Sequence, residues 1–327
     1  MSLTPKHLED FAGLDCSGTQ VLLTGSTSGI GRASALALGR LGASVIVHGR
    51  DADAGARVVE ELEAIGAEAR FLAADFADSE AVWDLAATIK AETDGLDVLI
   101  NNAGGIFPEA RFTDRGVEYT FQVNHLAPYL LTAELLDHLR PGARIVTTAS
   151  EAHRLACLDI DRVTRATNPR GGRRSGLTSA LPTSGIGSLT RAQWAYGHSK
   201  LANVLFAREL ADRLAAAERA VVSNSVHPGA IPGTGFARSL PGPLPRVVDS
   251  LDALPGTPSV EDGAAALLFA ALAPRTAGVS GRYFAGREPT LPSAAARDPE
   301  AARLLWERSA ALLGIDEPLA GYGYDDA

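Results

Sequence analysis

Cysteine is scarce in this sequence. Only Cys16 and Cys157 occur among 327 residues, so the chain cannot form a disulfide framework or a zinc site with four thiolates. Such sparing use of cysteine favours the reducing cytoplasm. Long apolar runs are absent too, since no stretch reaches the roughly 18 apolar residues of a membrane span. The polar N-terminus also lacks the apolar run of a signal peptide. We therefore expect a cytoplasmic protein without a membrane span.

Positive charge is also in short supply. The chain carries 30 lysine and arginine residues against 39 aspartate and glutamate residues, which gives a formal net charge of −9. Surfaces that bind nucleic acid or anionic lipid need a net basic footprint, so neither is an expected partner. The histidines lack the spacing with carboxylates that a metal site requires, and we expect no metal.

The sequence does contain short β-branched runs that alternate with longer helical patterns. The strand patterns lie at 21–24, 44–48, 69–74, 97–101, 144–149, 221–226 and 281–285. The helical patterns lie at 30–41, 53–65, 79–93, 116–139, 195–218 and 260–272. This order is typical of βαβ units, so we predict an α/β fold with a seven-stranded parallel sheet. We expect 1–327 to form one domain with a core at about 18–286.

Three segments depart from this rhythm. Residues 159–194 are rich in Gly, Ser, Thr and Arg, which is compatible with a solvated insertion loop and also with a lid or an oligomer contact. Residues 228–258 are rich in proline and glycine and are expected to be a mobile flap over the substrate. The extension 287–327 contains leucines at the spacing of a short amphipathic helix, which we expect to be a packing element.

The first strand is followed by TGSTSGIG at 24–31 and then by an alanine-rich helix. Glycines let the backbone approach a pyrophosphate without an intervening Cβ, and amides at the helix start hold the anion. The Gly-x3-Gly-x-Gly spacing differs from the ordinary dinucleotide fingerprint, and a plain tight turn is the alternative. The predicted phosphate-binding residues are Gly25, Ser26, Thr27, Ser28, Gly29, Ile30 and Gly31.

The end of the second predicted strand bears on the choice of dinucleotide. An acid there would accept from the ribose 2′-hydroxyl of NAD, whereas the sequence has Gly49 followed by Arg50. A guanidinium suits the extra phosphate, so we expect NADP(H) rather than NAD(H). A shift of one residue would bring Asp51 into place, and a surface role for Arg50 is the other alternative. Asp75, followed by Phe76, is placed either to accept from the adenine amino group or to cap a helix.

Tyr196 and Lys200 are four residues apart in the helical pattern 195–218, so their side chains lie on one face. A free tyrosine has a pKa near 10 and is a poor base at pH 7. A neighbouring cation favours the phenolate, which lets the phenol exchange a proton with an alcohol or a carbonyl. A surface pair at this spacing is the alternative, and the Tyr-x3-Lys pattern by itself is weak.

Further polar residues follow the predicted strand ends, which form the ligand crevice of an open α/β sheet. NNAG lies at 101–104, Ser150 lies just past the fifth strand, and His227 opens the sequence HPG after the sixth. Asn124 lies within the helical pattern 116–139. The further cofactor-binding residues predicted from these motifs are Asn102, Ala103, Gly104, Pro228 and Gly229.

In combination, TGSTSGIG, NNAG, VNHLA, the serine after the fifth strand and YGHSKLANVLFAREL resemble the short-chain dehydrogenase/reductase family, especially its retinol-dehydrogenase-like branch. The resemblance spans about 18–286 and implies a single Rossmann-type three-layer domain with an insertion before the catalytic helix. It implies a tetrad of Asn124, Ser150, Tyr196 and Lys200. Tyr196 would exchange the proton and Ser150 would hold the substrate oxygen. Lys200 would lower the tyrosine pKa and bind the nicotinamide ribose, and Asn124 would position a water.

The sequence departs from the family pattern in three ways, the first being Ala127, which stands where glycine is frequent after the helix asparagine. Ser150 and Tyr196 are 46 positions apart, more than the family commonly has, and Gly233 replaces the usual threonine after Pro-Gly. We expect an NADP(H)-dependent oxidoreductase that transfers a hydride between nicotinamide and a ketone, an aldehyde or an alcohol of a medium-sized apolar substrate. The alternative is a catalytically silent NADP(H)-binding sensor or partner-recruiting module. The resemblance also implies a homodimer or homotetramer.

Overall fold

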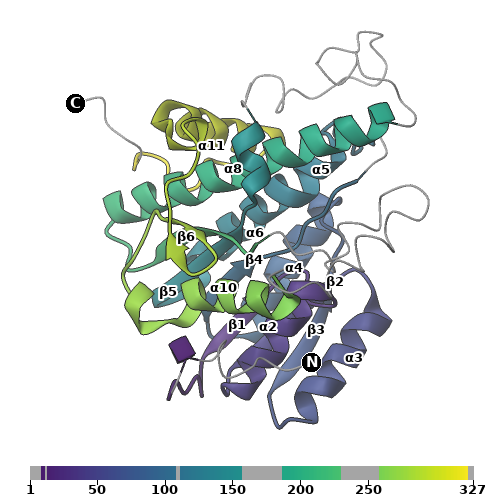
Figure 1. The fold of residues 1–327 in the computed structure, drawn as a ribbon, viewed down its shortest axis with the longest axis vertical. Coiled ribbons are helices and arrows are strands. Elements are labelled where there is room, and N and C mark those ends of the chain that lie inside the picture. The colour runs from purple at the N-terminus through teal and green to yellow at the C-terminus, as the bar shows by residue number, and fades with distance from the viewer. Residues whose placement is uncertain (1–8, 12, 108–110, 157–185, 230–257, 323–327) are drawn as a thin grey trace.

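A mostly parallel sheet forms the centre of the molecule (Figure 1). The computed structural model describes residues 9–11, 13–107, 111–156, 186–229 and 258–322. Its strands are β1 (Gln20–Leu23), β2 (Ser44–Gly49), β3 (Ala69–Ala73), β4 (Leu96–Asn101), β5 (Leu139–Thr148), β6 (Val222–His227), β7 (Tyr283–Ala285) and β8 (Glu288–Pro289). They follow the order β3-β2-β1-β4-β5-β6-β7-β8. The α/β prediction is confirmed, but the sheet has an eighth strand, which pairs antiparallel with β7. At two residues, β8 is too short to leave a sequence pattern.

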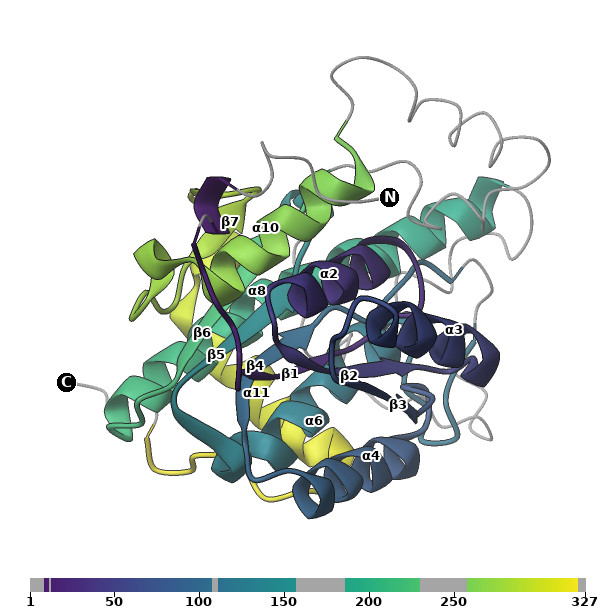
Figure 2. The same cartoon turned by 90° about the horizontal axis from the view of Figure 1, so that it is seen from below.

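Helices cover both faces of the sheet, which gives three layers (Figure 2). One face carries α2 (Gly29–Arg40), α3 (Ala52–Glu63) and α10 (Val260–Leu272). The other carries α4 (Ser79–Glu92), α6 (Ala127–Leu135) and α8 (Ile186–Ala216), with α11 (Pro299–Leu313) against α8. The short elements are η1 (Glu9–Phe11), α5 (Tyr119–Phe121), η2 (Gln122–Leu126), η3 (Leu136–His138), η4 (Glu151–Leu155), η8 (Pro274–Thr276) and η9 (Ala295–Arg297).

Side-chain alternation along the strands supplies a core to each face. In β1, Val21 and Leu23 enter the core under α2 and α10, whereas Leu22 enters the core under α4 and α6. All three side chains are fully buried. Strands covered on both faces are expected to be apolar almost throughout, and this explains why the sequence pattern located them.

The predicted helix at 116–139 is interrupted in the structure, and this corrects the sequence analysis. Helical structure begins only at Tyr119, and η2 is a π turn between α5 and α6. Such single π turns are frequently found at functional sites, and this one contains Asn124. The last predicted residue, Leu139, already belongs to β5. Hydrophobic periodicity alone cannot reveal a change in backbone hydrogen bonding within a helix.

The long helix α8 begins earlier than predicted. It starts at Ile186 rather than at residue 195, so 186–194 belong to this helix and not to the insertion predicted at 159–194. The insertion prediction for 159–185 and the flap prediction for 230–257 lie outside the described residues. The predicted amphipathic helix in the extension is present as α11, and Trp306 is buried with it against α8.

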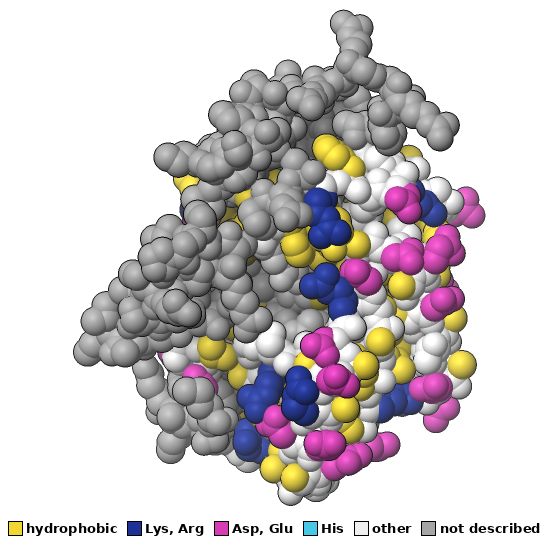
Figure 3. Space-filling view, turned by 90° about the vertical axis from the view of Figure 1, so that its right-hand side faces the viewer, with side chains coloured by type: hydrophobic (Ala, Val, Ile, Leu, Met, Phe, Trp, Pro, Cys, Tyr) yellow, Lys and Arg dark blue, Asp and Glu magenta, His cyan; other side chains and the backbone are white. Residues whose placement is uncertain are grey.

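Charged side chains of both signs are interspersed on the described face shown in Figure 3. Exposed ion pairs such as Arg70 with Glu92 at 3.0 Å are of a kind that contributes little to stability. Among the helices in the described ranges, none combines the length and apolar character needed to cross a membrane.

Candidate active site

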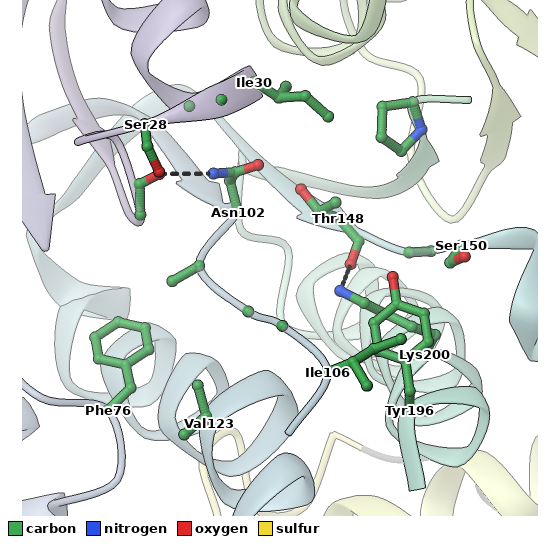
Figure 4. Close-up of a pocket in the computed structure, with 18 of the residues that line it drawn as sticks. Ser28, Ile30, Phe76, Asn102, Ile106, Val123, Thr148, Ser150, Tyr196 and Lys200 are labelled. Atoms are coloured by element: carbon green, nitrogen blue, oxygen red, sulfur yellow. Dashed lines mark hydrogen bonds between the residues drawn. The ribbon is translucent and has the colours of Figure 1, made fainter. Parts of the chain in front are cut away.

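A groove of about 730 Å³ crosses the carboxyl ends of the strands. Its volume is in the usual range for sites that hold small molecules and cofactors. From β1 the chain builds the sheet outward through β2 and β3, and β4 then starts again on the other side of β1. Open α/β sheets bind ligands at such a switch point. Figure 4 shows Phe76 and Val123 toward one end and Ser150, Tyr196 and Lys200 toward the other.

The turn between β1 and α2 brings bare backbone to the groove. Gly25 and Gly29 have φ angles of 64° and 54°, in the left-handed region that favours glycine. A Cβ on Gly31 would collide with the carbonyl oxygen of Gly25 and lie 2.8 Å from Nδ2 of Asn102. The N-cap residue Ser28 makes no side-chain capping hydrogen bond to the first turn of α2. A helix start without a side-chain acceptor is suited to an anion.

The ends of β1 and β4 are fastened together under this turn. The Thr24 hydroxyl accepts from the amides of Asn102 and Ala103 at 2.9 and 3.0 Å, and it donates to the carbonyl oxygen of Ile100 at 3.2 Å. The Asn102 side chain donates to the carbonyl oxygens of Thr24 and Gly25 at 3.0 and 3.2 Å. Asn102, which also lines the groove, therefore holds the turn in shape.

His48 is a buried residue beside the glycine turn, at the end of the groove near Phe76, and the motifs did not single it out. Its Nδ1 accepts from the amide of Gly25 at 3.3 Å, and its Nε2 lies 3.2 Å from the carbonyl oxygen of Ala74. These contacts assign the ring proton to Nε2. The ring stacks on Phe76 with centroids 4.5 Å apart. Burial lowers the pKa of His48 to about 4, so the ring is neutral at pH 7. Its only sequence signal is a histidine in an otherwise apolar strand.

Thr27 crowds position 49 at the end of β2, so a side chain there would require Thr27 to move. A Cβ on Gly49 would lie 2.6 Å from Cγ2 of Thr27. The Asp51 carboxylate is engaged as the N-cap of α3, where it accepts from the amide of Ala54 at 2.9 Å. Arg50 is exposed and its guanidinium lies 4.0 Å from Asp75.

Asp75 is not the cap of the following helix. The N-cap of α4 is Asp78, whose carboxylate accepts from the amide of Glu80 at 3.0 Å. One carboxylate oxygen of Asp75 accepts from the amide of Ala77 at 3.0 Å, within the turn after β3. Asp75 also lines the groove and is exposed, so it is available to a ligand there.

Three side chains meet at the opposite end of the groove. Tyr196 and Lys200 are one turn apart on α8, and Nζ of Lys200 lies 5.6 Å from the centre of the Tyr196 ring. The Tyr196 hydroxyl forms a hydrogen bond with the side chain of Ser150. Burial raises the pKa of Tyr196, and the bond to Ser150 opposes that rise. Figure 4 shows both helix side chains reaching into the pocket beside Ser150.

Lys200 is anchored to the end of β5. Its Nζ donates to the carbonyl oxygen of Thr148 at 2.8 Å, and Nδ2 of Asn203 donates to the same oxygen at 3.1 Å. Lys200 is only 3% exposed, and burial lowers its pKa to about 8. An amine with this pKa is still mostly protonated at pH 7.

Asn124 lies behind the groove wall, in the π turn of η2. Its side chain accepts from the amide of Gly105 at 2.9 Å and donates to the Gly105 carbonyl oxygen at 3.0 Å. It also donates to the Ser199 hydroxyl at 2.9 Å, which in turn donates to the carbonyl oxygen of Tyr196 at 2.8 Å. Asn124 therefore joins the loop after β4 to the helix that carries Tyr196.

The loop that carries Ser150 is fastened to the C-terminal part of the chain. His153 is fully buried, its Nδ1 lies 2.7 Å from the Ser150 carbonyl oxygen, and its Nε2 accepts from the amide of Ser293 at 3.1 Å. Because Nε2 is the acceptor, Nδ1 carries the proton and donates a hydrogen bond to the carbonyl oxygen of Ser150. The Tyr283 hydroxyl donates to the Glu151 carboxylate at 2.8 Å. Residues far along the sequence thus set the position of Ser150.

Most of the predicted site residues line the groove. They are Gly25, Thr27, Ser28, Gly29, Ile30, Gly31, Arg50, Asp75, Phe76, Asn102, Ala103, Gly104, Ser150, Tyr196, Lys200, Pro228 and Gly229. Ser26 and Asn124 do not line it, because both are fully buried. The Ser26 hydroxyl donates to the carbonyl oxygen of Leu23 at 2.7 Å and accepts from the amide of His48 at 2.9 Å, so it supports the turn from beneath.

Sequence reasoning missed part of the wall. The lining residues that were not among the predicted site residues are His48, Gly49, Ala74, Gly105, Ile106, Phe107, Val123, Thr148, Ala149, Glu151, Ala152 and His227. Val123 precedes Asn124 and Glu151 follows Ser150, so adjacency to a motif residue was the available signal. His198 is buried, and its Nδ1 lies 2.8 Å from the carbonyl oxygen of Trp194.

The chain is similar to several known proteins. A family model for short chain dehydrogenases matches residues 19–157. Human retinol dehydrogenase 13 is 33% identical over 315 residues, which cover 92% of this chain and 86% of that protein. A Streptomyces protein provisionally named a daunorubicin C-13 ketoreductase is 34% identical over 312 residues, which cover 95% of this chain and 97% of that protein.

Solved structures agree with these sequence matches. A short chain dehydrogenase from Burkholderia cenocepacia in complex with NADP superposes with a TM-score of 0.59 and 27% identity, over 82% of this chain and 96% of that chain. An open, mostly parallel sheet with a glycine-rich turn at its switch point is the architecture of dinucleotide-binding proteins. The chain belongs to the short-chain dehydrogenase/reductase family, in its retinol-dehydrogenase-like branch. It is a dehydrogenase/reductase that acts on CH–OH or C=O groups.

Proposed function

We propose that this protein is an NADPH-dependent carbonyl reductase in which Tyr196 supplies the proton. The supporting observation is that Tyr196, Ser150 and Lys200 converge on one end of a groove whose other end is built from glycine backbone. A groove that holds a dinucleotide along its length presents the nicotinamide to these three side chains. Reduction is preferred to oxidation because the residues at the end of β2 favour NADP(H).

The residues of the groove suit the coenzyme. The glycine turn leaves space that a Cβ would fill, and the start of α2 offers amides to a pyrophosphate. Asp75 and Phe76 would hold the adenine, while Tyr196 and Lys200 would hold the nicotinamide ribose. When bound, NADPH supplies a hydride for the carbonyl carbon of the substrate.

The proposed preference for NADP(H) rests on the end of β2. Position 49 is glycine and is crowded by Thr27, so it carries no acidic side chain that would accept from a ribose 2′-hydroxyl. The carboxylate of Asp51 already caps α3. Arg50 pairs with Asp75 only at 4.0 Å on the surface, an interaction too weak to prevent its guanidinium from binding a phosphate.

The chain's own groups provide the remaining chemistry of carbonyl reduction. The Ser150 hydroxyl holds the carbonyl oxygen beside the Tyr196 phenol, which donates its proton to that oxygen as the hydride adds to the carbon. The resulting phenolate is stabilised by the Lys200 ammonium and later takes a proton from solvent. Thr148 and Asn203 keep the ammonium in place by sharing one carbonyl oxygen.

We propose a ketone or an aldehyde of medium size and largely apolar character as the substrate. Ile106, Phe107 and Ala152 contribute apolar surface to the groove. The names of the relatives also support a carbonyl compound or its alcohol, since one is a retinol dehydrogenase and another a ketoreductase.

The experiment is NADPH consumption by the purified chain with a panel of quinones, ketones and aldehydes, monitored through the absorbance of the reduced nicotinamide. We expect turnover with apolar ketones or aldehydes and a clear preference for NADPH over NADH. Tight NADPH binding without consumption by any carbonyl compound would instead support the alternative of a silent sensor.

A further inference from the structure

His227 is a buried histidine in the groove wall for which the proposed mechanism has no use. It ends β6, is 9% exposed and lines the groove next to Pro228. Its Nδ1 is buried and has no hydrogen-bond partner among the residues that the structure describes. Buried polar atoms are nearly always paired, so an Nδ1 without a partner bears on which ring nitrogen carries the proton.

The sheet directs this side chain to the face that carries Tyr283. Val226 faces the core under α10, so the next residue, His227, points to the opposite face, where Tyr283 lies. The amide of Ala149 donates to the carbonyl oxygen of Val226 at 2.7 Å. The end of β6 is thus hydrogen-bonded to the residue just before Ser150.

The environment sets the protonation of His227. The titratable and charged groups that act on it are Glu151, His153 and Arg154. Burial lowers the pKa of His227, and Glu151 opposes this shift, so the ring is neutral at pH 7. A buried N–H without an acceptor is rarer than a buried acceptor without a donor. Placing the proton on Nε2 avoids a buried unpaired N–H, and Nε2 is then the hydrogen-bond donor of a residue that lines the groove.

A carboxylate accompanies this donor. Glu151 also lines the groove, and its side chain is 46% exposed. Tyr283 and Arg154 each donate to one of its oxygens, at 2.8 and 2.6 Å. These hydrogen bonds outweigh the effect of burial and keep the pKa of Glu151 below its usual value. Each oxygen retains a lone pair for another donor.

We propose that His227 and Glu151 form a polar subsite for a hydroxyl group of the substrate, one or two carbons from the carbonyl carbon. A hydroxyl both accepts and donates, so it can accept from Nε2 of His227 and donate to the Glu151 carboxylate. The substrate class is then a hydroxy ketone or hydroxy aldehyde with an otherwise apolar body. This inference rests on the proposed carbonyl reduction and specifies its substrate.

The test compares ketones that differ only by that hydroxyl, with saturating NADPH and the full chain. The pairs are phenacyl alcohol with acetophenone, and β-hydroxypropiophenone with propiophenone. We expect the wild type to have the higher kcat/KM for the hydroxylated member of at least one pair. His227→Leu should reduce this preference about five- to tenfold, mainly through KM, as the loss of one hydrogen bond predicts. Glu151→Gln should reduce it as well.

Two further variants separate recognition from damage to the fold. His227→Gln retains a donor near the position of Nε2 and should preserve most of the preference. His138→Leu replaces a histidine outside the groove, whose Nε2 lies 2.7 Å from Oγ1 of Thr93, and should leave the preference unchanged. NADPH affinity, measured by fluorescence titration, should be the same in all these proteins.

The outcomes are distinguishable. An unchanged preference in His227→Leu would overturn the subsite while leaving carbonyl reduction intact. Weaker NADPH binding with an unchanged preference would assign His227 to the coenzyme and would also overturn the subsite. If the wild type consumes NADPH with none of these four ketones, the proposed reduction is not supported for them. In that case, equilibrium binding of the two ketones to the NADPH complex tests the subsite. The subsite predicts that His227→Leu weakens the binding of phenacyl alcohol but not that of acetophenone, and any other result overturns it.

Discussion

The two ends of the groove are built in different ways. At the nucleotide end, where β1 leads into α2, local backbone forms the wall, and Gly25, Gly29 and Gly31 all lie between the end of β1 and the first turn of α2. At the catalytic end, side chains from distant segments form it, and the loop of Ser150 is held by Ser293 through His153. A site made of local backbone leaves a compact sequence motif, whereas a site assembled from distant segments does not. The two ends should also respond differently to mutation.

The largest effect is expected from Tyr196→Phe, which changes only the catalytic end. The variant loses the acid that protonates the carbonyl oxygen but keeps the apolar ring. Turnover should fall about a hundred- to ten-thousand-fold, the usual contribution of general acid catalysis. The dissociation constant of NADPH, measured by fluorescence titration, should change little. A variant that retains its rate would remove Tyr196 from the proposed mechanism.

Arg50→Ala should change only the nucleotide end. Removing the guanidinium should weaken NADPH binding by about ten- to a hundredfold, since hydrogen bonds to charged groups contribute roughly 1.5–3 kcal/mol. NADH binding should be unaffected, and the single-turnover rate at saturating NADPH should stay near that of the wild type. If the ratio of the two affinities is unchanged, Arg50 does not contact the phosphate.

Gly31→Ala tests whether the absence of a Cβ shapes the nucleotide end. The new methyl group would collide with the Gly25 carbonyl and displace Asn102, so NADPH affinity should fall about tenfold or more, which is at least about 1.4 kcal/mol. Gly142→Ala is the matched control, because a Cβ there meets no atom within 4 Å. Its φ of 88° makes the control slightly less stable, but NADPH affinity should not change. Equal losses of affinity in both variants would contradict this account.

The smallest effect is expected on the free energy of unfolding in acid, through His48 at the nucleotide end. Burial lowers the pKa of His48 from 6.5 to about 4 in the folded chain. Between about pH 6.5 and pH 4, the His48 side chain is therefore protonated in the unfolded chain but neutral in the folded chain. The free energy of unfolding decreases as the pH falls through that window. From pH 7 to pH 5 the free energy of unfolding should drop by about 1–2 kcal/mol through His48. In chemical denaturation, His48→Gln should show a smaller drop, and an equal drop would exclude His48 as the cause.

The sequence predicted the fold because buried parallel strands are apolar runs, and it predicted the nucleotide end because Gly25, Gly29 and Gly31 occur in one motif. It did not predict β8, the π turn at Asn124 or the early start of α8. These features depend on backbone hydrogen bonding and tertiary packing rather than on periodicity.

The catalytic end shows the same limit. Tyr196, Lys200 and Ser150 were found through motifs, but the groups that hold them were not. Thr148 acts through its backbone carbonyl, which no side-chain pattern reports. The bond between His153 and Ser293 joins residues 140 positions apart, and a single sequence gives no sign of such a contact.

Isotope transfer tests the central claim most directly. The chain is incubated with a reducible ketone and NADPH that carries deuterium at the transferable position of the nicotinamide, and the alcohol is examined by mass spectrometry and NMR. We predict one deuterium on the carbinol carbon of the wild-type product, and very little deuterated alcohol from Tyr196→Phe. An alcohol without deuterium, or equal transfer by the two proteins, would contradict the account.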